Sequence, residues 1–466
     1  MRRPGMSRLR ALLSAGAVFL AMGTARAAGP ADAPTAPSLV ERGAYLARAG
    51  DCVACHTAPG GRPFAGGLSM STPIGTIYST NITPDRDTGI GGWSFEEFDR
   101  LMRRGIRPEG GTVYPAMPYP SYSRLAEADM QALYAYFTQG VEPVRQANRD
   151  SDIPWPLSMR WPLALWRTFF APSPQPFQPQ PGQDPRVARG AYLVEGLGHC
   201  GACHTPRALT MQEEALTDGK SVFLSGGGPV DGWTAPSLRN EHGGGLADWS
   251  EAEIVAFLKT GRNAHTATFG AMNDVVVHSM QYLTDEDLGS IAAYLKSLRP
   301  HRPEAPPYRY DETTATALFN GDASARGAQI YVDRCAGCHR TDGRGYANAF
   351  PALAGNPVLQ TDNGTSAIHI VLSGGRLPGT RTAPSAFTMA PYAGLLSDEQ
   401  VADVVSFIQT GWGNRGKPVT VEDVRKMREQ AEPVKAEGWT SIAPATQTAA
   451  PQGADRAAKP PPPTQR

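Results

Sequence analysis

Cysteine is scarce in this chain, with 6 in 466 residues, and none lies outside three copies of one pentapeptide. No cysteine is therefore left for a structural disulfide or for a separate thiol site. Beyond residue 27 the chain also lacks a run of about 18 or more apolar residues, so we expect no membrane-spanning helix and only peripheral membrane contact. Neither charge dominates, because 44 basic residues balance 44 acidic ones, and this gives no reason to expect a nucleic-acid partner.

The three pentapeptides have the form C-x-x-C-H, which is the signature of covalent c-type haem attachment. In such a site the two thiols form thioether bonds to the haem and the adjacent histidine ligates the iron. A zinc site would need two cysteine pairs close together, whereas these pairs are far apart and each has its own histidine. A thioredoxin-like dithiol would need a βαβ context, which is not readable here. We therefore predict three covalently bound haem c groups, attached through Cys52, Cys55, Cys200, Cys203, Cys335 and Cys338, with His56, His204 and His339 as iron ligands.

The N-terminus agrees with haem attachment outside the cytoplasm. Residues 1–27 combine four arginines among the first ten residues, an apolar stretch and the small-x-small sequence Ala25-Arg26-Ala27, which is typical of a cleaved secretory signal. The chain is therefore predicted to be exported and to act at the periplasmic face of the inner membrane.

The chain length predicts about three domains, and an internal repeat supports that number. Each haem motif follows a short helical sequence that begins with Arg-Gly-Ala, and each repeat closes on a helix with apolar residues at helical spacing, predicted over 128–137, 285–298 and 397–408. The predicted fold is all-α, with three tandem class I cytochrome c-like domains. We call them repeat 1 (38–150), repeat 2 (186–298) and repeat 3 (319–412), joined by linkers 151–185 and 299–318 and followed by an extension, 413–466, that is partly disordered.

The second axial ligand of each iron decides whether the haem carries electrons or reacts with substrates. In a small cytochrome c a methionine on the loop before the closing helix supplies it. Met117 in repeat 1 and Met389 in repeat 3 stand in that loop beside prolines, which stiffen the chain. These two methionines are the predicted ligands of the first and third haems.

Repeat 2 offers more than one candidate for this ligand. Met272 is favoured by its distance from the closing helix, while Met280 lies much closer to that helix and remains an alternative, as do His265 and His278. The other ring nitrogen of a ligating histidine usually donates to a carbonyl. Such carbonyls are predicted at Pro236 and Pro351, with Pro73 the candidate in repeat 1.

One linker segment, 155–170, differs in composition from the rest of the chain. It holds three of the 8 tryptophans together with two arginines, a mixture found at bilayer interfaces, yet it is too short and too rich in proline to cross a membrane. Packing between domains, or against a partner subunit, explains the composition equally well. A second peripheral helix is expected over 425–439.

Together these motifs resemble the triple-haem cytochrome c subunits of membrane-bound dehydrogenases of acetic acid bacteria and their relatives, above all the alcohol dehydrogenase subunits. The segments that carry the resemblance are 75–85, 114–120, 155–166, 350–356 and 397–407. The resemblance implies a separate catalytic subunit with pyrroloquinoline quinone or flavin, and electron delivery from the cytochrome to ubiquinone. Gluconate, sorbitol and fructose dehydrogenases use similar subunits, so the substrate stays open.

Two rival functions belong to other classes. A multihaem peroxidase-like enzyme would need at least one iron without a second protein ligand, whereas every repeat here offers a methionine. A freely soluble carrier would need no fixed dehydrogenase partner, and the aromatic segment 155–170 argues against it. The leading hypothesis is an electron-transfer subunit with no substrate chemistry of its own.

Overall fold

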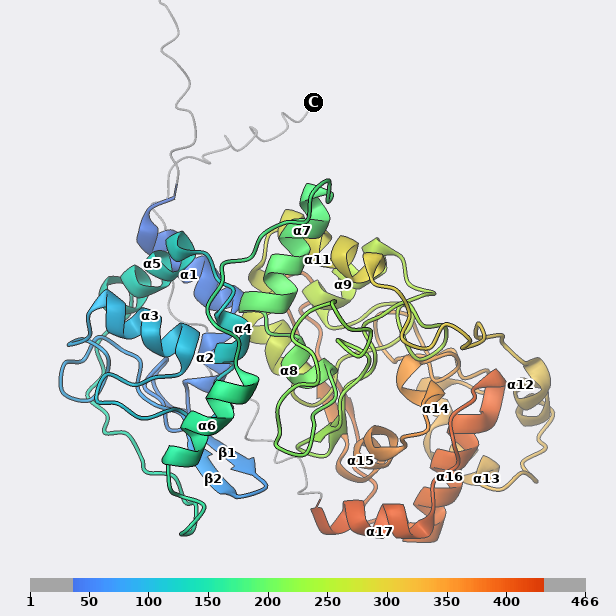
Figure 1. Ribbon diagram of the computed structural model, residues 1–466. Helices are drawn as coiled ribbons and strands as arrows, with labels where there is room; N and C mark the ends of the chain where they lie inside the picture. Colours follow the sequence, from blue (N-terminus) through green and yellow to red (C-terminus); the bar gives the residue numbers. More distant parts are fainter. Residues whose placement is uncertain (1–36, 431–466) are drawn as a thin grey trace, which may run out of the picture. The chain divides into compact units, whose positions relative to one another are not determined.

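The computed structural model describes residues 37–430 (Figure 1). The predicted signal peptide, 1–27, and the end of the C-terminal extension lie outside the described residues. Within 37–430 no helix is both long and apolar enough to cross a bilayer.

Each repeat is built on a crossed pair of helices, one before the haem motif and one at the end of the repeat. The pairs are α1 (Leu39–Ala49) with α5 (Glu127–Ala135), α7 (Pro185–Tyr192) with α11 (Asp285–Ser297), and α13 (Ala328–Arg334) with α16 (Asp398–Thr410). The closing helices thus form where the apolar periodicity predicts them. Figure 1 shows the first two pairs side by side, and it shows α16 of the third pair close to α17.

A glycine in the first helix, or in repeat 3 at its N-cap, makes each crossing possible. A Cβ atom built on Gly43, Gly190 or Gly327 would lie 1.9, 2.0 or 2.3 Å from a backbone carbonyl oxygen of the closing helix. Contacts this short do not occur between real atoms, so any side chain would push the two helices apart. The Arg-Gly-Ala sequence that marks the repeats is therefore a helix-crossing motif.

A third helix in each repeat lies between the haem motif and the closing helix: α3 (Phe95–Arg104), α9 (Glu251–Thr260) and α15 (Thr365–Ser373). The first two begin with capping boxes, Ser94 with Glu97 and Ser250 with Glu253, and both end on a left-handed glycine. In α15 the N-cap is a glycine without a side-chain cap.

The prediction of an all-α fold is incomplete, because three short antiparallel hairpins accompany the helices. They are β1 (Ser69–Thr72) with β2 (Gly75–Tyr78), β3 (Pro229–Val230) with β4 (Trp233–Thr234), and β5 (Gly375–Leu377) with β6 (Phe387–Met389). All three lie in the loops between a haem motif and the closing helix, where the chain is long enough to fold back and pair with itself.

The predicted linkers and the extension contain helices of their own. They are α6 (Trp161–Phe170), α12 (Glu312–Phe319) and α17 (Val421–Gln430). The expectation of a peripheral helix over 425–439 is wrong for its described part, because α17 packs on α15 and α16 and buries Val424 and Met427 in the core of repeat 3. Arg428 fixes it there by donating to Asp398 at 2.7 Å.

The remaining elements are single turns. Short α-helices run over Cys52–Cys55 (α2), Tyr119–Tyr122 (α4), Gly201–His204 (α8), Met272–Asp274 (α10) and Ala336–His339 (α14). π-helical turns span Tyr136–Gly140, Leu193–Leu197 and Val275–Ser279, and 3-10 turns span Met280–Tyr282, Pro357–Gln360 and Gly411–Gly413.

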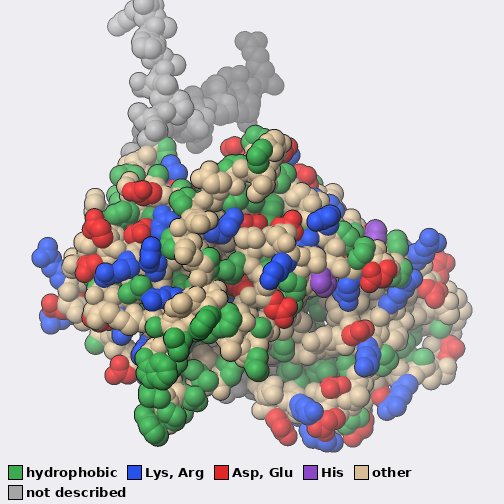
Figure 2. All heavy atoms as spheres, viewed as in Figure 1, with side chains coloured by type: hydrophobic (Ala, Val, Ile, Leu, Met, Phe, Trp, Pro, Cys, Tyr) green, Lys and Arg blue, Asp and Glu red, His purple; other side chains and the backbone are tan. Residues whose placement is uncertain are grey.

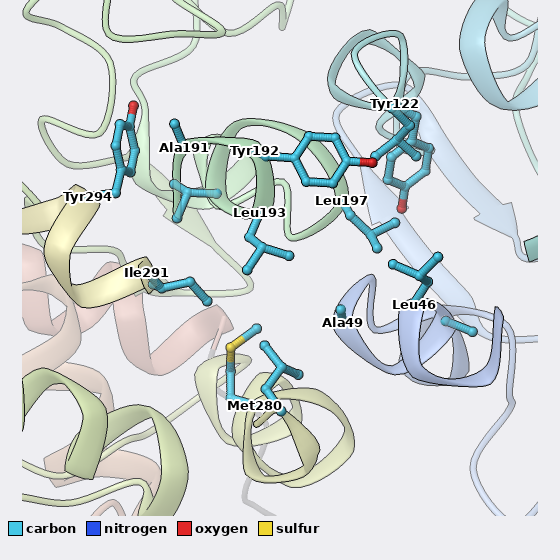
Figure 3. Packing of buried hydrophobic residues seen from close by; sticks show 14 of the residues in the cluster. Leu46, Ala49, Tyr122, Ala191, Tyr192, Leu193, Leu197, Met280, Ile291 and Tyr294 are labelled. Carbon is cyan, nitrogen blue, oxygen red and sulfur yellow. The ribbon is translucent and has the colours of Figure 1, made fainter. Parts of the chain in front are cut away.

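The hydrophobic cores do not follow the threefold repeat. Repeats 1 and 2 share one continuous cluster of buried residues, whereas repeat 3 has a separate cluster. Figure 3 shows the shared core, in which Leu46 and Tyr122 of repeat 1 lie near Leu197 of repeat 2. Repeats 1 and 2 are therefore packed as one body.

Candidate haem-binding sites

The three C-x-x-C-H motifs form the single-turn helices α2, α8 and α14. In each motif the first cysteine is half-buried and the second is exposed. Residues three apart lie on the same side of a helical turn, so the two thiols of each motif face the same region. This is the arrangement that two thioether bonds to one haem require.

Each motif histidine is oriented by a backbone carbonyl. The Nδ1 atoms of His56, His204 and His339 lie 2.7, 2.8 and 2.9 Å from carbonyl oxygens of Thr80, Pro236 and Pro351. A carbonyl can only accept, so Nδ1 must carry the proton and Nε2 keeps the lone pair that can bind iron.

The prediction of these carbonyls holds in two repeats and fails in one. Pro236 and Pro351 are the acceptors, as expected, but Pro73 is not. Pro73 lies in the turn between β1 and β2, and the chain passes the His56 ring only after the hairpin, at Thr80.

The backbone of each histidine is also held, by a glycine that sequence reasoning missed. The N–H groups of Gly66, Gly226 and Gly345 donate to the carbonyls of His56, His204 and His339 at 2.8, 2.9 and 3.1 Å. All three glycines have positive φ, at 76°, 105° and 57°. No spacing signal could have found them, because Gly66, Gly226 and Gly345 follow their histidines at unequal distances along the chain.

Burial sets the protonation of these side chains. It lowers the pKa of His56, His204 and His339, so the imidazoles are neutral at physiological pH, as an iron ligand must be. It raises the pKa of the first thiol of each motif to about 12. Geometry and protonation of the histidines therefore fit covalently bound haem.

The structure places the predicted methionines in comparable surroundings. Met117, Met272 and Met389 are all half-buried, Met117 just before α4, Met272 at the start of α10 and Met389 in β6. Met117 packs against the shared core of repeats 1 and 2, and Met389 packs against the core of repeat 3. Their role as iron ligands remains a prediction.

Two of the three alternatives to Met272, namely Met280 and His265, have contacts of their own. Met280 is only 6% exposed and belongs to the shared core, where Figure 3 shows it on the side of Leu193 and Ile291. The Nε2 atom of His265 lies 3.0 Å from the Glu253 carboxylate, and its ring stacks on Trp249. Met272 remains the predicted ligand, with His278 the alternative for which no such side-chain contact is described.

Three domains, each with a helix-borne C-x-x-C-H motif and a histidine held through Nδ1, define a multihaem c-type cytochrome. The three cysteine pairs bind three haem c groups covalently. A family model described as cytochrome c matches residues 40–140, 187–299 and 324–412, and the chain belongs to this family.

Known relatives cover almost the whole chain. It is 56% identical to the alcohol dehydrogenase (quinone) cytochrome c subunit of Gluconacetobacter polyoxogenes, over 94% of this chain and 93% of the relative. It is also 56% identical to the gluconate 2-dehydrogenase cytochrome c subunit of Pantoea cypripedii, over 88% and 94%. The fructose dehydrogenase cytochrome subunit of Gluconobacter japonicus is 35% identical over 88% and 87%.

Proposed function

We propose that this chain is the electron-transfer subunit of a membrane-bound dehydrogenase that faces the periplasm. It would relay electrons from a quinoprotein catalytic subunit of the alcohol dehydrogenase type, through its three haems, to ubiquinone. The observation that carries this proposal is the threefold repetition of one haem-binding geometry in a chain similar to cytochrome c subunits of dehydrogenases over nearly its full length.

The chain's own residues suit a carrier better than an enzyme. Bound haem supplies a reversible one-electron change at iron, which requires no group on the protein to bind a substrate. The histidine of each motif is fixed at both its ring and its backbone, and each repeat presents a half-buried methionine in the segment that precedes its closing helix. Two protein ligands per iron would leave no open position for a peroxidase reaction.

The catalytic partner has a second candidate. The gluconate 2-dehydrogenase cytochrome subunit is as similar in identity as the alcohol dehydrogenase subunit, at 56%. A flavin-dependent sugar or sugar-acid dehydrogenase is therefore the alternative partner.

The segment 155–170 supports contact with the membrane surface. Its helix α6 buries none of its residues, and Trp155, Trp161 and Phe169 are 80%, 63% and 75% exposed. Figure 2 shows hydrophobic side chains gathered over α6. Arginines are the only charged side chains in the segment, which suits an anionic bilayer.

The aromatic segment is also anchored to the protein beneath it. Trp166 donates its Nε1–H to the Thr210 carbonyl at 2.8 Å, and the Arg160 guanidinium lies 4.5 Å from the centre of the Tyr114 ring. Tyr114 belongs to the loop that carries Met117. A membrane contact at this segment would bring repeat 1 close to the bilayer and its quinone pool.

Purification from washed membranes tests the proposal. The chain should require detergent for release, and it should be recovered with a larger dehydrogenase subunit whose cofactor identifies the alcohol or the sugar-acid alternative. Recovery of the chain alone from the soluble periplasmic fraction would contradict both the complex and the membrane contact.

A further inference from the structure

Two reciprocal hydrogen bonds join repeats 1 and 2, each from a tyrosine of one repeat to an aspartate of the other. Tyr45 of α1 donates its hydroxyl to the Asp287 Oδ2 atom of repeat 2 at 2.5 Å, and Tyr192 of α7 donates to the Asp129 Oδ2 atom of repeat 1 at 2.5 Å. Each hydroxyl also accepts from the backbone N–H at the start of the other repeat's closing helix, at Thr284 (3.3 Å) and Ala126 (3.2 Å). Each tyrosine therefore caps the closing helix of the opposite repeat.

The two aspartates are buried, and each carboxylate accepts hydrogen bonds from both a tyrosine and an arginine. Their side chains are only 3% and 10% exposed, and each is also paired with the Arg-Gly-Ala arginine of its own repeat, Arg42 for Asp129 and Arg189 for Asp287. Arg189 donates from Nε and Nη2 at 2.7 and 2.9 Å. A buried carboxylate that loses one of these donors stays desolvated and unsatisfied, which costs free energy. Each tyrosine bond therefore stabilises the packing of repeat 1 against repeat 2.

Repeat 3 differs from the other two at both positions. Gln329 stands where repeats 1 and 2 have the tyrosine, and it donates to Asp333 on its own helix at 2.9 Å. Gln400 stands where they have the aspartate, and its Oε1 atom accepts from the Ser397 N–H at 2.9 Å. The closing helix of repeat 3 thus caps itself and needs no hydroxyl from another repeat.

The two tyrosines lie on the helices that lead into the first two haem motifs. Helix α1 ends three residues before Cys52, and α7 continues through a π-helical turn toward Cys200. The two segments that lead into the motifs are in contact: a Cβ built on Gly50 would lie only 2.9 Å from the Leu197 side chain. The His199 ring, which directly precedes Cys200, packs edge-on against Tyr122 of repeat 1 at 5.9 Å.

We propose that Tyr45 and Tyr192 are positioning residues that lock the first two haem-attachment segments together, so that the first two haems form a fixed pair. The shared hydrophobic core of repeats 1 and 2 agrees with this pairing. Repeat 3 has its own apolar core and is joined to repeat 2 by other contacts, such as the stacking of His369 on Trp233. The inference depends on haem binding in repeats 1 and 2, and not on the identity of the dehydrogenase or of the electron acceptor.

The test uses the full chain with its three haems. The variants are Tyr45→Phe, Tyr192→Phe and the double variant, with Tyr134→Phe as the matched control. Tyr134 also loses one hydroxyl bond, to the Trp93 carbonyl at 2.7 Å, but that bond lies within repeat 1. Haem content and the visible spectrum are recorded first, and both should be unchanged in every variant.

Two readouts then follow the geometry. Amide exchange at the N-termini of α5 and α11 should rise about tenfold or more in the double variant, because each helix loses a charge-assisted bond and its cap. Pulsed EPR distances from the first ferric haem to the other two should broaden, whereas the distance between the second and third haems should stay unchanged. The control should leave both readouts at wild-type values.

A double variant with an unchanged set of inter-haem distances would overturn the proposal, and so would equal broadening in the Tyr134→Phe control. If the double variant does not take up haem, the two single variants decide the question by the same distances. Failure of the dehydrogenase proposal would leave these measurements unaffected, because none of them involves a partner.

Discussion

The glycine at the helix crossing of repeat 2 allows a prediction in which two chemically identical changes have opposite effects. Gly190 and Gly289 lie on the crossed helices α7 and α11. A Cβ on Gly190 would lie 2.0 Å from the Ser290 carbonyl oxygen and 2.6 Å from the Tyr294 Cβ. A Cβ on Gly289 would meet its nearest neighbour, an Arg186 nitrogen, at 3.6 Å, which is ordinary contact.

The magnitudes follow from these distances. In either helix, replacing glycine by alanine gains about 1 kcal/mol of helix stability. At Gly190 this gain is outweighed by overpacking, which costs about 1–3 kcal/mol and occasionally more, and the upper end applies because backbone atoms must move by about 1 Å. We expect Gly190→Ala to lower the free energy of unfolding by about 2 kcal/mol, and Gly289→Ala to raise it by up to about 1 kcal/mol.

The assay must resolve one part of a multidomain protein, because a single unfolding midpoint is not well defined for such a chain. Native-state amide exchange of α7 and α11 measures the local free energy directly. Exchange in α16, which belongs to the separate core of repeat 3, serves as the internal reference. Equal effects of the two substitutions, or a stabilising Gly190→Ala, would refute the helix-crossing argument.

Three further predictions concern the ligands, the pH dependence and the membrane. Met272→Leu should remove one low-spin methionine-ligated signal from the ferric spectrum, whereas Met280→Leu should keep all three; the reverse result would exchange their roles. Burial alone would raise the pKa of Asp287, but hydrogen bonds from an arginine and a tyrosine lower it on balance. Its contribution to stability is therefore present above the unfolded pKa and is lost as the pH falls through the folded pKa, so Asp287→Asn should flatten acid unfolding below about pH 4, and an unchanged profile would contradict this. Trp161→Ser with Phe169→Ser should weaken binding to anionic lipid vesicles by at least tenfold in a sedimentation assay, with Phe319→Ser, an exposed aromatic residue on α12, as the control; equal loss in the control would contradict a specific contact.

Local patterns in the sequence were enough to predict the parts of the sites that are close together in the chain. The cysteines and the histidine of each motif lie within five residues, so their joint position on one turn follows from spacing alone. Pro236 and Pro351 could be predicted as acceptors because each lies in the loop that follows its motif. Thr80 could not, because the β1–β2 hairpin moves the chain past the proline that seemed equivalent.

Features that depend on packing between repeats were not predictable from local patterns. The Tyr45–Asp287 bond joins residues 242 apart in sequence, and nothing in the Arg-Gly-Ala-Tyr sequence indicates that its tyrosine reaches another repeat. The same limit explains why the packing of α17 was not predicted. Its apolar residues suggest an amphipathic surface helix, and only the fold shows that Val424 faces the core of repeat 3.

Carbon monoxide binding to the dithionite-reduced protein tests most directly whether all three haems are six-coordinate electron carriers, as we propose. With a histidine and a methionine on every iron, the ferric spectrum should be entirely low-spin and the reduced protein should bind no carbon monoxide within the time of mixing. A high-spin ferric component together with rapid binding of one equivalent of carbon monoxide would contradict the account, because it would reveal an open iron and a site for substrate chemistry.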